Sequence, residues 1–284
     1  MQRPSNGFPF GDGAAPPGKT TRGAGTIERP MSVSSQDKSP TKKKEGGILE
    51  TARVIFHALL IALVIRTFLF QPFNIPSGSM MATLLVGDYL FVSKYSYGYS
   101  KYSFPLSLPL FDGRIIGSAP ERGDVVVFRL PKDDTTDYIK RVIGLPGDRI
   151  QMIGGVLHIN GEAVKRERVE DYVDEDGGRT VRVRRWRETL PNGVSYLTLD
   201  LQDNGFLDNT QVYEVPPGHY FMMGDNRDNS TDSRVLSQVG YVPFENLIGK
   251  AQVIFFSVAD GVPAWHVWAW PWAVRWDRLL TLVR

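Results

Sequence analysis

The arrangement of apolar and polar positions divides the chain into four stretches. Residues 1–47 are rich in Gly, Pro, Ser, Thr and Lys and contain few apolar residues. A segment of this composition buries too little surface to offset the entropy of ordering, so it predicts a disordered tail. Ile48–Phe70 form a nearly continuous apolar run, residues 71–260 alternate short apolar runs with turn residues, and residues 261–284 are rich in tryptophan.

The apolar run is long enough to cross a lipid bilayer. As a helix it would span about 34 Å, compared with about 30 Å for the hydrocarbon core. Arg66 lies near its far end and can reach the headgroups. No small-residue cleavage pattern follows, which predicts a retained anchor. Lys42–Lys44 precede the run, so the N-terminus is predicted to be cytoplasmic and everything after Gln71 to lie on the outer face. A buried helix of a soluble domain is the alternative.

Asp88–Val258 have the pattern of a β domain. Short runs of β-branched and aromatic residues recur there, separated by turn signals such as GLPGD and PPGH, and no long segment follows a 3.6-residue period. The predicted fold class is therefore mainly β, with an antiparallel sheet in residues 71–260. The highly charged Arg166–Gly193 predict an exposed, inserted cap within about 155–210. A pair of ordinary surface strands explains the same charges.

The C-terminal stretch has an unusual concentration of aromatic residues. Ala264–Arg284 hold five of the six tryptophans. Because tryptophan is enriched at membrane interfaces, this tail is predicted to lie in the headgroup layer of the outer leaflet. A helix that packs on the sheet is the alternative, although Pro271 argues against one continuous helix.

Composition removes several classes of chemistry. The chain has no cysteine, which excludes disulfides, Cys-ligated metals and a thiol nucleophile. The formal net charge is only +2, so no nucleic-acid partner is implied. The four histidines, none close in sequence to a plausible nucleophile, are His57, His158, His219 and His266. Sequence spacing alone leaves a Ser-His-Asp triad open, because its members are neighbours in space.

Ser79 is the first candidate for chemistry. It lies in PSGSM, Pro76–Met80, where Pro76 and Gly78 favour a turn that leaves the backbone accessible on one side. A serine in such a turn can present its hydroxyl and its backbone N–H together, and Ser77 can add a second hydroxyl. Such donors stabilise an oxyanion as it forms. The turn is therefore a candidate nucleophile site.

Lys140 is the second candidate, because it lies inside an otherwise apolar strand pattern. Alternation places Lys140 on one face of the strand and Ile139 and Arg141 on the other. If Lys140 points inward, burial penalises its ammonium form, and lowering its pKa to about 8 requires about 3.3 kcal/mol. A neutral Lys140 could then accept the proton of Ser79. A surface lysine on an edge strand is the alternative.

The third candidate is the polar segment GDNRDNSTDSR, Gly224–Arg234. Asp232 and Arg234 could form a salt bridge that braces the strand carrying Lys140. Ser230 could orient that lysine through a hydrogen bond. A calcium loop is the competing idea, with oxygen ligands from Asp225, Asp228 and Asn229. Their spacing does not match an EF-hand, and arginines interrupt them.

Together these segments resemble the bacterial type I signal peptidases, also called leader peptidases. PSGSM after a membrane span resembles the nucleophile box of the family. Three further segments resemble the other boxes of the family, in the same order: GDVVVF (Gly123–Phe128), DYIKRVIGLPGD (Asp137–Asp148) and GDNRDNSTDSR. The family consists of membrane-bound serine endopeptidases, which remove N-terminal signal peptides from exported preproteins on the outer face of the bacterial inner membrane. Its best-studied members have two transmembrane segments, whereas this chain shows one clear span.

The resemblance implies a role for each matching residue. Ser79 would be the nucleophile and Lys140 the general base of a Ser-Lys dyad. The implied supporting groups are Ser77 and the Ser79 N–H in the oxyanion hole, with Ser230, Asp232 and Arg234 around the lysine. The implied walls of the substrate pockets are Phe73, Ile75, Met80, Leu84, Tyr138 and Ile139. No cofactor and no metal are implied, and the implied partners are signal peptides and membrane lipids.

Two other functions fit the sequence. One is a specialised Ser-Lys peptidase of the same fold, such as a maturation protease for pili or conjugation. The other is an anchored β module that binds exported chains without cutting them, although the presence of both Ser79 and Lys140 argues against it.

Overall fold

The computed structural model describes residues 47–104, 107, 111–176 and 179–284. The predicted disordered tail and Lys42–Lys44 lie outside these residues, except for Gly47. The helices are α1 (Ile48–Phe68) and α2 (Trp270–Ala273), with short 3-10 turns η1 (Gly78–Met80), η2 (Lys101–Ser103), η4 (Phe244–Asn246), η5 (Val267–Ala269) and η6 (Trp276–Arg278). The strands are β1 (Phe70–Asn74), β2 (Asp88–Ser93), β3 (Tyr99–Ser100), β4 (Arg114–Ile115), β5 (Val125–Arg129), β6 (Asp137–Gly144), β7 (Arg149–Ile153), β8 (Val156–Ile159), β9 (Glu162–Ala163), β10 (Lys165–Arg168), β11 (Tyr172–Asp176), β12 (Arg179–Thr189), β13 (Ser195–Asp200), β14 (Tyr213–Glu214), β15 (His219–Met223), β16 (Val242–Pro243), β17 (Leu247–Ser257) and β18 (Thr281–Leu282).

The apolar run forms α1, but the helix ends earlier than the sequence predicts. It stops at Phe68 instead of Phe70, because Phe70 pairs with Ser93 as the first residue of β1. Within the described residues, α1 is the one helix long and apolar enough to cross a membrane, with a mean hydropathy of 2.1 over its best window. None of that window is buried against the protein, so the alternative of a core helix in a soluble domain does not hold.

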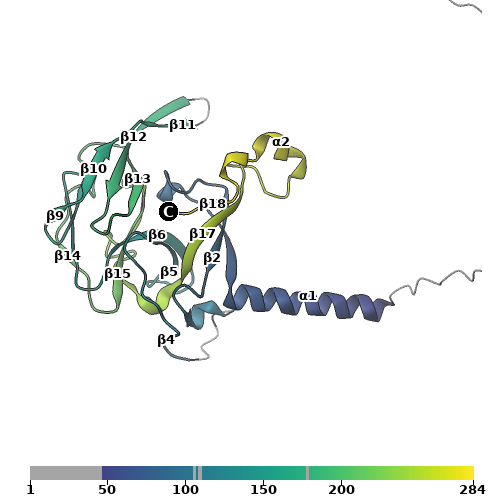
Figure 1. Ribbon diagram of the computed structural model, residues 1–284. Helices are drawn as coiled ribbons and strands as arrows, with labels where there is room; N and C mark the ends of the chain where they lie inside the picture. The colour runs from purple at the N-terminus through teal and green to yellow at the C-terminus, as the bar shows by residue number, and fades with distance from the viewer. Residues whose placement is uncertain (1–46, 105–106, 108–110, 177–178) are drawn as a thin grey trace, which may run out of the picture. The chain divides into compact units, whose positions relative to one another are not determined.

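The largest sheet carries the residues of interest. Its strands follow the order β1-β2-β17-β5-β6-β15-β16, and β18 pairs with β17 (Figure 1). Every pairing between named strands of the sheet is antiparallel, which confirms the predicted fold class. β6 contains Lys140, and β1, which lies several strands away in this order, precedes the turn that carries Ser79.

The charged stretch 166–193 consists largely of strands. β12 pairs with β11 along its first half and with β10 and β13 along its second half. Figure 1 shows the β11–β12 hairpin extending beyond β10 and β13. Not all of this stretch is exposed, since Glu188 near the end of β12 is fully buried. A further small sheet has the order β14-β7-β8-β9.

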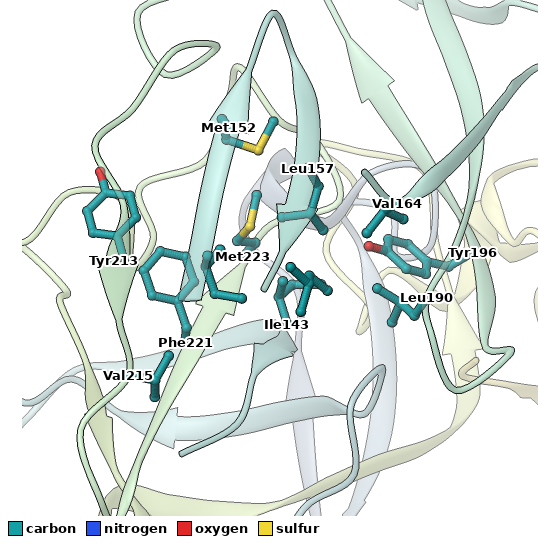
Figure 2. Packing of buried hydrophobic residues seen from close by; sticks show 12 residues of the cluster. Ile143, Met152, Leu157, Val164, Leu190, Tyr196, Tyr213, Val215, Phe221 and Met223 are labelled. Atoms are coloured by element: carbon teal, nitrogen blue, oxygen red, sulfur yellow. The ribbon is translucent and has the colours of Figure 1, made fainter. Parts of the chain in front are cut away.

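Apolar side chains join these sheets into one body. Ile143 and Phe221 from the large sheet pack with Leu157 of β8 and Tyr196 of β13 (Figure 2). A second cluster holds Met80 and other residues beneath the turn that carries Ser79, and its members include Leu84, Leu90, Val127 and Ile254. Full burial of such a side chain contributes about 1.5–3 kcal/mol, so this cluster fixes the Ser79 turn on the sheet.

The tryptophan-rich tail is a series of short elements around Pro271. Four tryptophans are largely exposed: Trp265, Trp268, Trp272 and Trp276. Trp270 instead packs against Phe256, with ring centroids 5.1 Å apart. The tail is also tied to the sheet, because Arg278 Nε lies 3.0 Å from a carboxylate oxygen of the buried Asp88. The predicted membrane contact of this tail therefore concerns only part of its side chains.

Candidate functional site

Ser79 and Lys140 meet although 61 positions separate them in the sequence. Lys140 Nζ lies 2.6 Å from Ser79 Oγ, and both side chains are buried. The distance is within the range in which a nucleophile passes its proton directly to a base. Ser77 Oγ lies 3.4 Å from Ser79 Oγ, so the second hydroxyl predicted at this turn is also present.

The position of Ser79 follows from contacts on both sides of its turn. Met80, the next residue, is fully buried in the apolar cluster. On the other side Asn226 holds the backbone: its N–H donates to Ser79 O at 3.1 Å and its amide Nδ2 donates to Gly78 O at 3.1 Å. The serine is thus held between the core and the Gly224–Arg234 segment, in which no sequence pattern singled out Asn226.

Lys140 lies in β6 with an exposed fraction of only 3%. Burial lowers its pKa from 10.5 to about 8, although the carboxylates of Asp232 and Asp225 act in the opposite direction. Its second hydrogen bond goes to Ile139 O, at 2.9 Å. No carboxylate lies within salt-bridge distance of Nζ among the described residues. A substantial fraction of Lys140 is therefore neutral near pH 8 and able to accept a proton.

The Gly224–Arg234 segment forms a dense hydrogen-bonded scaffold next to this pair. Asp232 accepts from Arg234 Nη2 at 2.8 Å, as predicted, and from Ser230 Oγ at 2.8 Å. Gly224 lies so close to Ser79 that a Cβ atom there would be 2.5 Å from Ser79 O and would overlap Ser230 Oγ. Only a glycine fits between these two serines.

Ser230 does not contact the lysine directly in this arrangement. Ser230 lines the cleft onto which Ser79 and Lys140 open, but the hydrogen bond that its hydroxyl donates goes to Asp232. The hydrogen bonds of Lys140 Nζ go to Ser79 and to Ile139. Orientation of the lysine by Ser230 therefore stays a prediction, and Ile139 O is the acceptor that positions Nζ here.

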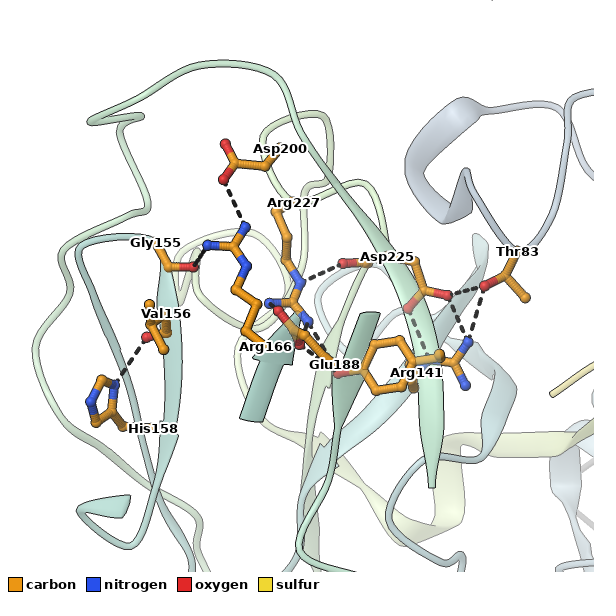
Figure 3. A network of polar contacts seen from close by, with 12 residues as sticks. Thr83, Arg141, Gly155, Val156, His158, Arg166, Glu188, Asp200, Asp225 and Arg227 are labelled. Carbon is orange, nitrogen blue, oxygen red and sulfur yellow. Dashed lines mark hydrogen bonds and ion pairs between the residues drawn. The ribbon is translucent and has the colours of Figure 1, made fainter. Parts of the chain in front are cut away.

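Two buried ion pairs that the sequence did not predict support the scaffold (Figure 3). Arg141, the residue after the lysine, makes two hydrogen bonds to Asp225 at 2.8 and 2.7 Å. Thr83 donates to the same carboxylate at 2.5 Å. Arg227 forms a bidentate pair with Glu188, at 2.9 and 2.6 Å. These pairs link β6, the loop after Ser79 and β12 to the polar segment.

The same contacts argue against the calcium alternative. Both carboxylate oxygens of Asp225 are hydrogen-bonded to Arg141, and Asp228 accepts from the backbone N–H groups of Leu201 and Gln202. These oxygens therefore serve the protein's own donors. Within the described part of the chain, no group of three or more acidic or histidine side chains has the arrangement of a metal site.

Ser79 and Lys140 open onto a cleft of about 740 Å3. Four of the predicted substrate-contacting residues line it: Phe73, Ile75, Tyr138 and Ile139. Met80 and Leu84 do not. Both are fully buried in the apolar cluster, so their role as pocket walls stays a prediction. The cleft is also lined by Leu207, which the sequence did not suggest.

The histidines take no part in this site. His158 Nδ1 donates to Val156 O at 3.0 Å, and His219 Nδ1 donates to Pro217 O at 2.9 Å. Neither lines the cleft, and neither do His57 and His266. Lys140 is the basic group that contacts Ser79.

Known proteins resemble this chain over most of its length. Residues 48–256 match the family described as "Signal peptidase, peptidase S26". A signal peptidase I from Rickettsia typhi is 51% identical over 207 residues, which cover 70% of this chain and 76% of that protein. One from Rickettsia akari has the same identity and coverage. A crystal structure of a signal peptidase I from Enterococcus faecalis is 27% identical and covers 47% of this chain and 97% of its own, but its TM-score of 0.28 is too low to support an argument from shape.

Proposed function

Because the chain belongs to the signal peptidase family, peptidase S26, we propose that Ser79 and Lys140 are the catalytic pair with which it removes signal peptides. The family and the relatives named signal peptidase I support a serine endopeptidase that cuts N-terminal signal peptides from exported preproteins. The observation that carries the assignment of residues is the 2.6 Å contact between Ser79 Oγ and a buried lysine.

The geometry supports a sequence of proton transfers in which Lys140 acts twice. Neutral Lys140 accepts the proton of Ser79 Oγ while the oxygen attacks the carbonyl carbon of the scissile peptide bond. The hydroxyl of Ser77 and the N–H of Ser79 would donate to the oxyanion that forms. The Lys140 ammonium then protonates the leaving amine, and the acyl group stays on Ser79. Neutral Lys140 next takes a proton from water while the water oxygen attacks the acyl carbon. When the bond between that carbon and Ser79 Oγ breaks, the Lys140 ammonium returns the proton to Oγ, which restores Ser79 and releases the carboxylate product.

The cleft is suited to an extended peptide. Phe73 and Asn74 of β1 pair only with β2, and Asp137–Lys140 of β6 pair only with β5, because β15 joins β6 from Arg141 onward. Both segments line the cleft, so each offers a strand edge without a strand partner among the described residues. A substrate strand could pair with these edges and place its scissile bond at Ser79. Wall positions filled by Ile75 and Ile139 leave shallow apolar pockets, which favour small residues at −1 and −3 from the cut.

The membrane arrangement is a proposal that α1 supports by its length and composition. α1 would cross the bacterial inner membrane once, with Lys42–Lys44 on the cytoplasmic side. The β domain, residues 71–260, would then lie on the outer face, where exported chains emerge. Membrane lipids would be neighbours of α1 and of the exposed tryptophans of the tail.

The test is cleavage of a peptide with an Ala-x-Ala site by the purified full chain in detergent. Ser79→Ala and Lys140→Ala should each reduce kcat/KM at least about a thousandfold, and the double variant should be little worse, because the two residues act as a unit. The matched controls are the exposed residues in Ser237→Ala and Lys132→Ala, which should retain wild-type turnover. Near-normal turnover by Lys140→Ala would reject the dyad. Absence of cleavage by the wild type would favour a binding module, and cleavage only at a different site would favour a specialised maturation protease.

A further inference from the structure

A second pocket lies beside the catalytic cleft and has no role in the chemistry above. It encloses about 420 Å3 and is lined by Arg66 and Thr67 from the last turn of α1, by Lys94 just after β2, and by Arg129 and Asp137 from β5 and β6. Asp137 also lines the catalytic cleft, so the two spaces share a wall. The pocket thus connects the end of the apolar helix with the strand that carries Lys140.

The carboxylates of this pocket already have cationic partners. Asp137 lies 3.1 Å from Arg129 Nε. Asp134 lies 3.3 Å from Lys101 Nζ and accepts from the Tyr102 hydroxyl. Arg66 and Lys94 form no ion pair with any residue that the structure describes. Among the described residues, two cationic side chains of the pocket, Arg66 and Lys94, therefore have no direct ion-pair partner.

Lys94 is a buried cation without a carboxylate at salt-bridge distance among the described residues, although the Asp137 charge acts on it from farther away. Its exposed fraction is 2%, and Nζ donates a single hydrogen bond, to Ser103 O at 2.6 Å. Burial and the nearby Arg66 charge lower the pKa of Lys94 from 10.5 to about 8, although the Asp137 carboxylate acts in the opposite direction. Attraction between opposite charges is strongest where water is excluded. An anion placed between Arg66 and Lys94 would therefore be held firmly and would favour the ammonium form.

We propose that this pocket binds the phosphate of an anionic phospholipid headgroup. Arg66 and Thr67 end the apolar helix, at the level where a spanning helix meets the headgroup layer. A guanidinium can hold two phosphate oxygens in parallel, and a lysine adds a point charge. The side chains of Thr67 and Gln71 have no hydrogen-bond partner among the described residues and line the same pocket as neutral donors. The inference rests on the proposed membrane placement of α1 and is independent of the Ser-Lys chemistry.

The experiment measures lipid retention by the full chain in detergent micelles with native mass spectrometry. Phosphatidylglycerol is compared with phosphatidylcholine, whose headgroup has no net charge. The wild type should retain one phosphatidylglycerol with about tenfold preference. Arg66→Gln and Lys94→Met should each reduce that preference to near one. Arg53→Gln is the matched control, since it removes an exposed arginine from the other end of the same helix and should leave the preference unchanged.

Three results would overturn the proposal. One is equal retention of the two lipids by the wild type. The second is an unchanged preference in Arg66→Gln, a variant that should fold normally because Arg66 is exposed, as its thermal unfolding will verify. The third comes from adding millimolar inorganic phosphate: displacement of phosphatidylglycerol would assign the site to the free anion, whereas retention supports the lipid headgroup.

Discussion

The pKa of Lys140 makes the pH dependence of cleavage the sharpest test of the proposed chemistry. With a pKa of about 8, about half of the lysine is neutral at pH 8, about a tenth at pH 7 and about a hundredth at pH 6. Because its pKa is lowered from 10.5 to about 8, the buried lysine provides about 300 times more base at pH 7 than an exposed one would.

The measurement is kcat/KM of the full chain for a peptide substrate between pH 5.5 and 10.5, which reports the titration of the free enzyme. The rate should fall about tenfold per unit below pH 7 and level off above pH 9. Circular dichroism at each pH serves as the control for unfolding. A rate that stays flat down to pH 6 would show that Lys140 is not the base, and a rise only near 10.5 would show that it is not buried during the reaction.

The same shift affects stability, with a definite sign. Between pH 8 and 10.5 the unfolded lysine still carries its proton while the folded one has lost it, so the free energy of unfolding rises with pH in that window. The full rise is about 3 kcal/mol for a shift of this size. Lys140→Met should therefore stabilise the fold below pH 8 and lose that advantage by pH 10.5, whereas Lys132→Met, at an exposed position, should do neither. The free energy of unfolding is measured in urea at each pH. If it depended on pH in the same way in both variants, the burial argument would be contradicted.

Three further predictions concern the scaffold and the tail. Glu188→Gln leaves the buried Arg227 guanidinium without its counter-charge and should cost about 3–5 kcal/mol in urea unfolding, whereas Glu162→Gln on exposed β9 should cost almost nothing; equal costs would argue against the pair. Gly224→Ala should cost about 1–3 kcal/mol of folding stability and should strongly lower kcat, because the new methyl group must displace Ser79 or Ser230. An unchanged kcat would show that the turn can accommodate the methyl group without moving Ser79. In proteoliposomes, brominated lipids should quench the tryptophan fluorescence of the full chain, and changing Trp265, Trp268, Trp272 and Trp276 to Phe should remove most of that quenching; persistent quenching would reject the interfacial tail.

Local patterns in the sequence were sufficient for the elements of the fold. The length of the apolar run predicted α1, and the recurring β-branched runs predicted an antiparallel β domain. What the patterns could not give is the pairing of strands. β2 pairs with β17, more than 150 positions later, and this order results from packing of side chains that are distant in sequence. The end of α1 was misplaced for the same reason, since Phe70 leaves the helix to pair with β2.

In the candidate site, too, local patterns identified single residues but not the contacts between residues that are distant in sequence. Turn chemistry marked Ser79, and a charge within an apolar strand marked Lys140, because each signal lies within a few residues. Asp225 was considered as a calcium ligand, but its partner is Arg141, 84 positions away. No local pattern indicates that pairing. Met80 and Leu84 were predicted as pocket walls from the family resemblance, and in the structure both side chains are buried in the apolar core.

The buried charges around the cleft explain why the base has to be a lysine. Arg141, Arg227 and Arg234 are as buried as Lys140, and each has a carboxylate at 2.8 Å or less. A guanidinium keeps its proton at any accessible pH, so these residues can only be structural and need a counter-charge. Lys140 has a hydroxyl and a backbone carbonyl as its partners instead. Without a paired carboxylate its ammonium is destabilised, so the environment that would be unfavourable for a structural cation is the one that yields a neutral amine beside Ser79.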